Sequence, residues 1–143
     1  MPRRFHPKSP RPKSIFNLCG GGIRRDQADI YFSKFIRLRA KWKCEACFKS
    51  LGEGGGEASH FWGRRNESVR YDIENVSCLC NYCHRRFTEN PEDHRQWMMK
   101  KLGKDRFNAL MVRATTIKKK DRKLAAIIAK KLYEEECKHQ SKL

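Results

Sequence analysis

Two pairs of cysteines have the spacing of a metal site. Cys44 and Cys47 form one C-x-x-C pair, and Cys80 and Cys83 form a second, with 32 residues between the pairs. A C-x-x-C turn directs two thiolates toward one tetrahedral ion, so two such turns complete a four-sulfur site typical of structural Zn²⁺. A redox-active pair would instead need a thioredoxin-like βαβ context, which this sequence lacks. We therefore expect these four cysteines to bind one zinc ion.

The other three cysteines have no partner at ligand spacing. We expect Cys78 to be a buried, small apolar residue, and Cys19 and Cys137 to have no role in metal binding.

Three polar residues around the second cysteine pair have types suited to phosphodiester hydrolysis. His60 lies 15 residues before Asn75, and His84 directly follows Cys83. Hydrolysis needs a group that deprotonates water near neutral pH, and histidine, with an unperturbed pKa of about 6.5, suits that role. It also needs a cation that stabilises charge on the phosphorus and the leaving oxygen. Each residue alone could instead have a purely structural role. His60 could be an ordinary strand histidine, Asn75 a turn residue, and His84 a neighbour of the zinc site.

Together these residues resemble the HNH, or ββα-metal, endonuclease family over residues 44–88. The resemblance rests on His60 at the end of a first strand, Asn75 before a second strand, and the run L-C-x-x-C-H that ends at His84 and leads into a helix. It implies that His60 is the general base, that Asn75 fixes its imidazole and the loop, and that His84 binds a catalytic divalent ion such as Mg²⁺ or Mn²⁺. It also implies cleavage of DNA to 5′-phosphate and 3′-hydroxyl ends.

The sequence departs from the family pattern at two positions. Many members carry Asp or His directly before the base as a second metal ligand, whereas this chain has Ser59, a weak candidate ligand. Some members carry a further His where this chain has Thr88.

Arginines gather in the segment between His60 and Asn75. Arg64, Arg65 and Arg70 could clamp a phosphate of the DNA through paired N–H donors; a solvated loop is the alternative for each of them. A looser resemblance, to the NinG/Rap recombination nucleases, rests on similar cysteine pairs around a short G-H motif. It implies branched DNA as an alternative substrate.

Helices and strands must position these side chains. Ala28, Tyr31, Phe35, Leu38 and Trp42 recur at spacings of three and four, which predicts an amphipathic helix from Asp26. Residues 57–62 and 76–79 are predicted as short strands joined by a polar loop.

Further helices are expected after the second cysteine pair. Asn90 and Pro91 have the types that begin a helix, and Gly103 can end it. A second helix is predicted over residues 104–115, and a third from Ile117 to about Cys137, with Leu124, Ile128 and Leu132 on one side.

These elements predict an α+β protein with a zinc-stapled ββα-metal (HNH) centre. The expected organisation is a disordered basic tail over residues 1–25, a nuclease domain with both zinc knuckles over residues 26–90, and a helical basic extension over residues 91–143. Only 38% of the residues are hydrophobic, so we expect a small hydrophobic core. A bound metal ion would stabilise such a fold, because its binding free energy contributes to the free energy of folding.

The charge of the chain indicates a polyanionic partner. Lys and Arg number 33 against 16 Asp and Glu, a net charge of +17, which argues against a protein specialised for small apolar ligands. Residues 1–43, 44–90 and 91–143 carry net charges of +10, −1 and +8, so a near-neutral centre has two basic flanks. DNA, double-stranded or branched, is the expected partner, and a homodimer is an option for cutting both strands. A non-catalytic zinc-ribbon DNA-binding protein is the alternative from another class, and charge alone does not exclude RNA.

No segment has the character of a membrane span or secretion signal. The longest apolar run, Leu124 to Ala129, is far shorter than the about 20 residues of a spanning helix. The residues after Met1 are basic and rich in proline. We expect a cytoplasmic, nucleoid-associated protein of a bacterial or phage-infected cell.

Overall fold

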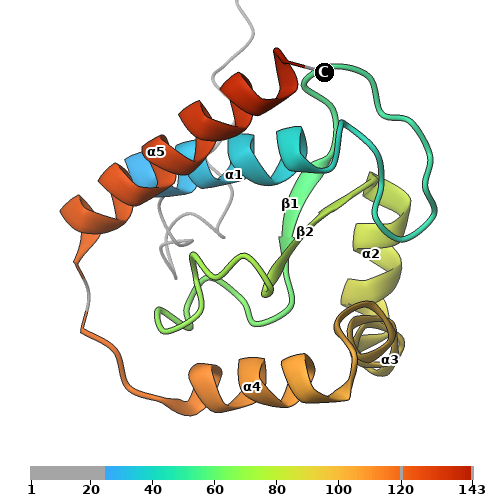
Figure 1. Cartoon of the computed structure of the whole chain (residues 1–143). Coiled ribbons are helices and arrows are strands. Elements are labelled where there is room, and N and C mark those ends of the chain that lie inside the picture. Colours follow the sequence, from blue (N-terminus) through green and yellow to red (C-terminus); the bar gives the residue numbers. More distant parts are fainter. Residues whose placement is uncertain (1–24, 120, 143) are drawn as a thin grey trace, which may run out of the picture.

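A computed structural model describes residues 25–119 and 121–142, in which five helices surround a two-stranded sheet (Figure 1). The fold is therefore α+β, as predicted. The expected tail over residues 1–25 lies outside the described residues except for Arg25. In chain order the elements are α1 (Gln27–Arg39), β1 (Glu57–His60), β2 (Val76–Leu79), α2 (Asn81–Glu89), α3 (Pro91–Leu102), α4 (Lys104–Thr115) and α5 (Arg122–Gln140).

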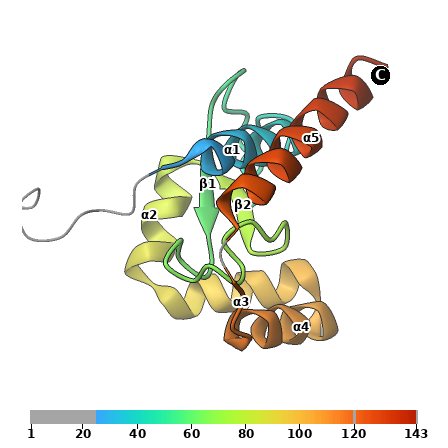
Figure 2. The same ribbon diagram turned by 90° about the vertical axis from the view of Figure 1, so that its left-hand side faces the viewer.

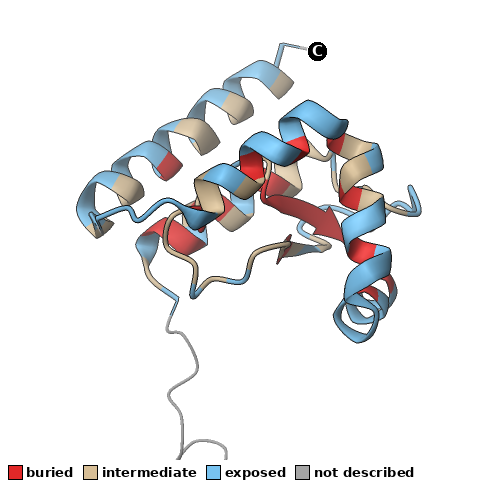
Figure 3. Cartoon of the chain, turned by 90° about the horizontal axis from the view of Figure 1, so that it is seen from below, coloured by how far each residue is buried: buried red, intermediate tan, exposed pale blue. Residues whose placement is uncertain are grey.

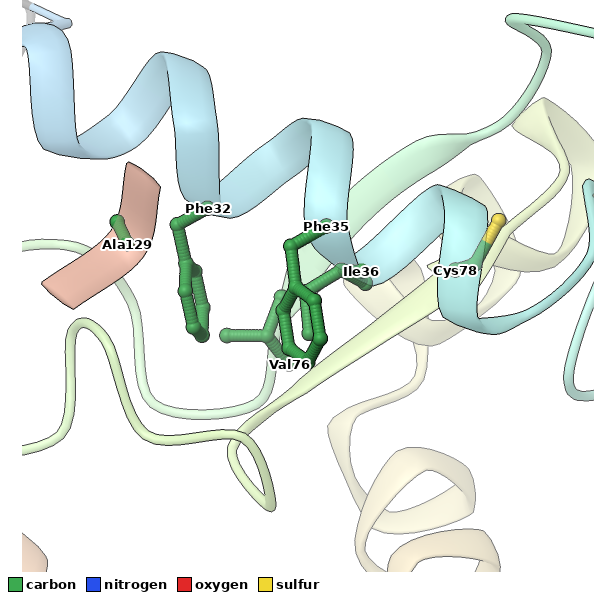
Figure 4. Close-up of a cluster of buried hydrophobic side chains, with 6 residues drawn as sticks. All are labelled: Phe32, Phe35, Ile36, Val76, Cys78 and Ala129. Atoms are coloured by element: carbon green, nitrogen blue, oxygen red, sulfur yellow. The ribbon is translucent and has the colours of Figure 1, made fainter. Parts of the chain in front are cut away.

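Helix α1 begins where the sequence predicts, because Asp26 and Asp29 form a reciprocal capping box at its first turn. Its buried side chains Phe32, Phe35 and Ile36 point toward the sheet, where they pack with Val76 (Figure 4). The predicted stripe is only partly correct: Ala28 and Phe35 are buried, but Tyr31, Leu38 and Trp42 are half-buried. The difference arises because α1 is covered by α5 as well as by the sheet, so two neighbouring stripes are apolar.

The sheet is an antiparallel hairpin in which Ala58 pairs with Cys78 and His60 pairs with Val76. Strand β2 is where the sequence places it, whereas β1 ends at His60, two residues before the predicted end. Among the described residues β1 pairs only with β2, so its other edge has no strand partner. Figure 2 shows β1 below α1, with α2 on one side of it and β2 on the other.

Helices α2, α3 and α4 follow one another with almost no intervening chain. Pro91 occupies the first turn of α3, and Gly103, with a φ of 78°, ends α3 and precedes α4. The prediction of helices beginning at Asn90-Pro91 and spanning residues 104–115 is confirmed.

Helix α5 returns to the far side of the molecule and packs against α1 (Figure 1). It begins at Arg122, five residues later than predicted, because Asp121 caps it by accepting a hydrogen bond from the backbone N–H of Leu124. Figure 3 shows that most of this helix is exposed, and Ala129 is its one buried residue. The predicted stripe is largely at the surface, since Leu124 and Ile128 are half-exposed. No helix in the described part of the chain is long and apolar enough to cross a membrane.

Candidate metal centre and active-site pocket

The first cysteine pair lies in a tight turn between α1 and β1. The backbone N–H groups of Cys44 and Phe48 donate to the carbonyls of Lys49 and Cys44, at 2.9 and 2.8 Å. Glu45 fastens this turn to β2, because its N–H donates to the Cys78 carbonyl at 2.8 Å and its carboxylate accepts from the Cys78 N–H. These hydrogen bonds hold the turn beside the hairpin.

The second pair is positioned by the start of α2. Cys80 is the N-cap of this helix, and its Sγ accepts a hydrogen bond from the N–H of Cys83 at 3.4 Å. The four sulfurs of Cys44, Cys47, Cys80 and Cys83 lie within 4.8 Å of one another. Four thiolates at such spacing match a tetrahedral site with Zn–S bonds of about 2.3 Å. The four cysteines are therefore positioned to bind a metal ion, consistent with structural zinc.

The other cysteines stand apart from this cluster. Cys78 is fully buried under α1, as predicted, and burial raises the pKa of its thiol to about 11. Cys137 is half-buried on α5. Cys19 lies outside the described residues.

A pocket of about 590 Å³ opens along β1, bounded by residues of α1 and α2. It brings together His60 and His84, which are 24 positions apart in the sequence. Three arginines also line it, so the pocket is basic, and the two carboxylates among its described lining residues are Asp29 and Glu57. The lining residues are Arg25, Asp29, Phe32, Ser33, Arg37, Gly56, Glu57, Ala58, His60, Gly63, Arg64 and His84.

His60 is held by a backbone hydrogen bond that selects its tautomer. Its Nε2 lies 2.9 Å from the carbonyl oxygen of Arg70. A carbonyl only accepts hydrogen bonds, so Nε2 carries the proton, and Nδ1 has the free lone pair. Burial lowers the pKa of His60, and the nearby charge of Arg64 lowers it as well, whereas the bond to the Arg70 carbonyl opposes this shift. The imidazole is therefore neutral at physiological pH and can accept a proton at Nδ1.

Asn75 is fully buried and fastens the loop that follows His60. Its Oδ1 accepts from the N–H of Trp62 at 2.8 Å, and its Nδ2 donates to the carbonyls of Trp62 and Val69 at 2.9 and 3.0 Å. All these bonds hold the two ends of the segment between His60 and Arg70. Asn75 thus fixes the loop whose carbonyl orients the His60 ring.

His84 lies in the first turn of α2, and its Nδ1 contacts the carboxylate oxygen Oε2 of Glu57. Ser59, by contrast, is 3% exposed and does not line the pocket. The structure therefore does not bring Ser59 to the place where His84 meets a second potential ligand. Thr88 donates its hydroxyl hydrogen bond to the carbonyl of His84, at 2.9 Å.

The three predicted DNA-binding arginines have different surroundings. Arg64 lines the pocket, and Arg65 is exposed beside it; neither forms an ion pair with another residue that the structure describes. Arg70 differs from the expectation, because its side chain is fully buried and binds carboxylates of Asp29 and Glu67. A guanidinium enclosed in this way has no access to a phosphate, so only its carbonyl faces the site.

The Arg70 pair belongs to an ionic cluster that joins α1, the loop and α5. Arg122, at the start of α5, contacts both Asp26 and Glu67. Burial would raise the pKa of Asp26, but hydrogen bonds from the Asp29 backbone, Arg122 and Tyr71 lower it to about 2. The carboxylate of Asp26 therefore remains charged at neutral pH, and the ion pairs of the cluster hold the loop against both helices.

Two site residues were not found from the sequence. Asp29 looks like an ordinary acidic residue of a first helical turn, and its partner Arg70 is 41 positions away. Glu57 lies three residues before His60, but no spacing links it to His84. The one local signal is the glycine run before Glu57. Gly56 has a φ of 87°, and a Cβ there would lie 2.6 Å from the Cys78 sulfur, so a side chain at this position would push β1 away.

Comparison with known proteins identifies the family of the chain. No curated protein and no solved structure matches it significantly. A sequence model of the family described as "Bacteriophage Lambda NinG protein" matches residues 24–142, which is most of the chain and includes the cysteine cluster and the pocket. Of the two resemblances seen in the sequence, this match supports the looser one. The chain belongs to the NinG family.

Proposed function

We propose that this protein is a divalent-metal-dependent endonuclease that hydrolyses phosphodiester bonds in DNA by HNH-type chemistry. The observation that carries the proposal is the placement of His60. It is a neutral histidine in a basic pocket, its Nε2–H is fixed by a carbonyl, and its Nδ1 is available as a base. A structural histidine satisfied on both nitrogens would lack that free acceptor.

The residues of the pocket divide the chemistry between them. His60 takes a proton from the attacking water at Nδ1, and Asn75 keeps the loop in place while it does so. Arg64 binds the phosphate of the strand to be cut. His84 would hold the divalent ion, which when bound stabilises negative charge on the phosphate and the leaving oxygen. The zinc cluster has a structural role, joining the first turn to α2.

One such centre cuts one strand. A double-strand break would therefore need a homodimer or two successive binding and cleavage events. The resemblance to recombination nucleases implies branched DNA as an alternative substrate, so junctions and plain duplexes should be compared directly.

The test is cleavage of supercoiled plasmid and of a four-way junction with Mg²⁺, Mn²⁺, Ni²⁺ or Zn²⁺. His60→Ala should lower the cleavage rate by about 100-fold or more and leave DNA affinity nearly unchanged, because loss of the base raises only the chemical barrier. His139→Ala, at an exposed histidine near the end of α5, is the matched control.

Full activity in the His60→Ala protein would show that His60 is not the general base. DNA binding without cleavage by the wild type under every metal would favour the alternative, a non-catalytic zinc-ribbon DNA-binding protein.

A further inference from the structure

A carboxylate and an imidazole from distant parts of the chain meet at the α2 side of the pocket. Oε2 of Glu57, at the start of β1, contacts Nδ1 of His84, in the first turn of α2. Their side chains are 46% and 40% exposed, and both line the same pocket as His60. A ligand in the pocket can therefore reach both groups.

The register of the hairpin explains why Glu57 occupies this place. Side chains alternate along a strand, so Glu57 and Ser59 share one face of β1, and Ala58 lies on the other. Ala58 packs in the cluster beneath α1, whereas Leu79, the pairing partner of Glu57, packs with Cys83 of α2. The face shared by Glu57 and Ser59 is therefore the α2 face, and the exposed carboxylate lies two residues before the buried serine.

The charges around the pocket single out Glu57 further. Of the two carboxylates that line the pocket, Asp29 is paired with the buried guanidinium of Arg70. Among the residues that the structure describes, Glu57 forms no ion pair with an arginine or lysine, and its carboxylate contacts His84. With Arg25, Arg37 and Arg64 in the same lining, a divalent cation needs a negative side chain to offset their repulsion. Glu57 is the carboxylate placed to supply it.

We propose that Glu57 and His84 together bind the divalent ion of this site, with Glu57 in place of a ligand at Ser59. The inference rests on the proposed nuclease function and assigns the ligands of its ion. Mg²⁺ and Mn²⁺ favour carboxylate oxygens, and such ions are commonly held by one or two protein groups, with water and substrate phosphates completing the shell. Two protein donors beside a phosphate-binding arginine fit that pattern.

An ordinary surface ion pair is the competing explanation of the contact. Exposed pairs contribute little to stability, so stability measurements would not separate the two. Ion binding separates them, because an ion pair predicts no dependence of metal affinity on Glu57.

The experiment measures Mn²⁺ binding to the zinc-loaded full chain by titration calorimetry, and by the loss of the free Mn²⁺ signal in electron paramagnetic resonance. Both measurements are made with and without duplex DNA. Glu57→Gln keeps the size of the side chain and removes its charge. We expect it to weaken Mn²⁺ binding by about tenfold or more, and His84→Gln to do the same. Glu89→Gln, at an exposed carboxylate on α2 outside the pocket, is the control and should bind Mn²⁺ as the wild type does. Zinc content must stay at one ion per chain in every variant.

The outcomes distinguish this inference from the proposed function. Wild-type affinity in Glu57→Gln overturns the ligand assignment, even if cleavage still requires His60. Absence of Mn²⁺ binding by the wild type, with and without DNA, overturns it as well. Binding that depends on Glu57 and His84 in a protein that cleaves no DNA supports the metal site and contradicts the nuclease.

Discussion

His60 is surrounded by groups that favour its neutral, proton-accepting form. Burial and the charge of Arg64 both lower its pKa, and the Arg70 carbonyl fixes the proton on Nε2. A general base works only when unprotonated, so activity must fall as the pH drops through this pKa. Because the pKa is lowered, the acidic limb of the pH–rate profile should lie below about 6.5.

Arg64→Gln should move that limb to higher pH. The positive charge of Arg64 disfavours the imidazolium, so its removal raises the pKa of His60. The measurement is the initial nicking rate at saturating DNA from about pH 5 to about pH 8, with zinc content checked at each pH. Arg65→Gln removes an equal charge that is not among the main causes of the lowered pKa of His60 and should leave the limb in place. A limb that stays fixed in Arg64→Gln would contradict this account of the base.

Residues at short, patterned spacing could be predicted from the sequence, and residues paired across the fold could not. The four cysteines were predicted because each C-x-x-C turn is a local structure, and the cluster is confirmed. Arg70 was predicted as a phosphate ligand, but its side chain is buried and paired with Asp29 of α1, which is 41 positions away in the sequence. Glu57 was not predicted as a site residue, because only the packing of α2 against β1 brings it to His84.

At the scale of helices and strands, the ionic cluster around Arg70 links the loop between His60 and Asn75 to α1. The side chain of Arg70 is fully buried and that of Asp29 nearly so. Removing one partner of such a pair leaves an uncompensated charge in the interior, which is strongly destabilising. The same loop supplies the carbonyl that orients His60, so the cluster also supports the site.

Asp29→Asn should lower the free energy of unfolding by about 3 kcal/mol, because it leaves Arg70 with part of its charge unpaired. Urea denaturation followed by circular dichroism measures this. Glu92→Gln removes an exposed partner of Arg95 on α3 and should cause no measurable change. Equal effects of the two substitutions would mean that burial does not strengthen the Asp29–Arg70 pair.

The cysteine cluster joins the turn before β1 to α2, and the core between them is small. Cys80→Ser should therefore lower the thermal midpoint sharply and abolish tight zinc binding, as should a strong chelator with the wild type. Metal analysis should show one Zn²⁺ per wild-type chain. Cys137→Ser alters a thiol outside the cluster and should retain the ion. Purified wild-type protein without tightly bound zinc would refute the assignment.

Helix boundaries were predictable where a single residue type sets them. Gly103 separates α3 from α4, and α4 spans the predicted residues. The start of α5 was predicted at Ile117, but Ile117 is 99% exposed and lies outside any helix, because the cap is Asp121. Periodicity alone also did not show which apolar stripe of α1 meets the sheet, since α5 covers the neighbouring stripe.

At the scale of the whole molecule, basic segments flank a centre with almost no net charge. In space, α1 and α5 lie on one side of the hairpin, and α3 and α4 lie on the other (Figures 1 and 2). Residues 44–90, which contain the hairpin and the cysteine cluster, carry a net charge of −1 out of a total of +17. Most electrostatic affinity for DNA should therefore come from the flanks, through interactions with phosphates that do not depend on base sequence.

Deletion of residues 1–22 tests whether DNA affinity depends on the basic flanks and catalysis on the central residues. The deletion removes Arg3, Arg4, Lys8, Arg11 and Lys13 and leaves His60, His84 and the cysteine cluster intact. DNA affinity should fall, and the slope of log K against log salt should become less negative by about 0.9 for each phosphate that the shortened chain no longer neutralises. Turnover at saturating DNA should change much less than affinity.

A full-length chain with glutamine at those five positions is the matched variant, because it removes the charges and keeps the length. If charge is the cause, it should reproduce the flatter slope of the truncation. An unchanged slope in both proteins would mean that the phosphates are bound elsewhere in the chain, at Arg64, Arg65 and the basic faces of the helices. Affinity and catalysis would then depend on overlapping residues, and Arg64→Gln would weaken DNA binding as well as shift the pH–rate profile.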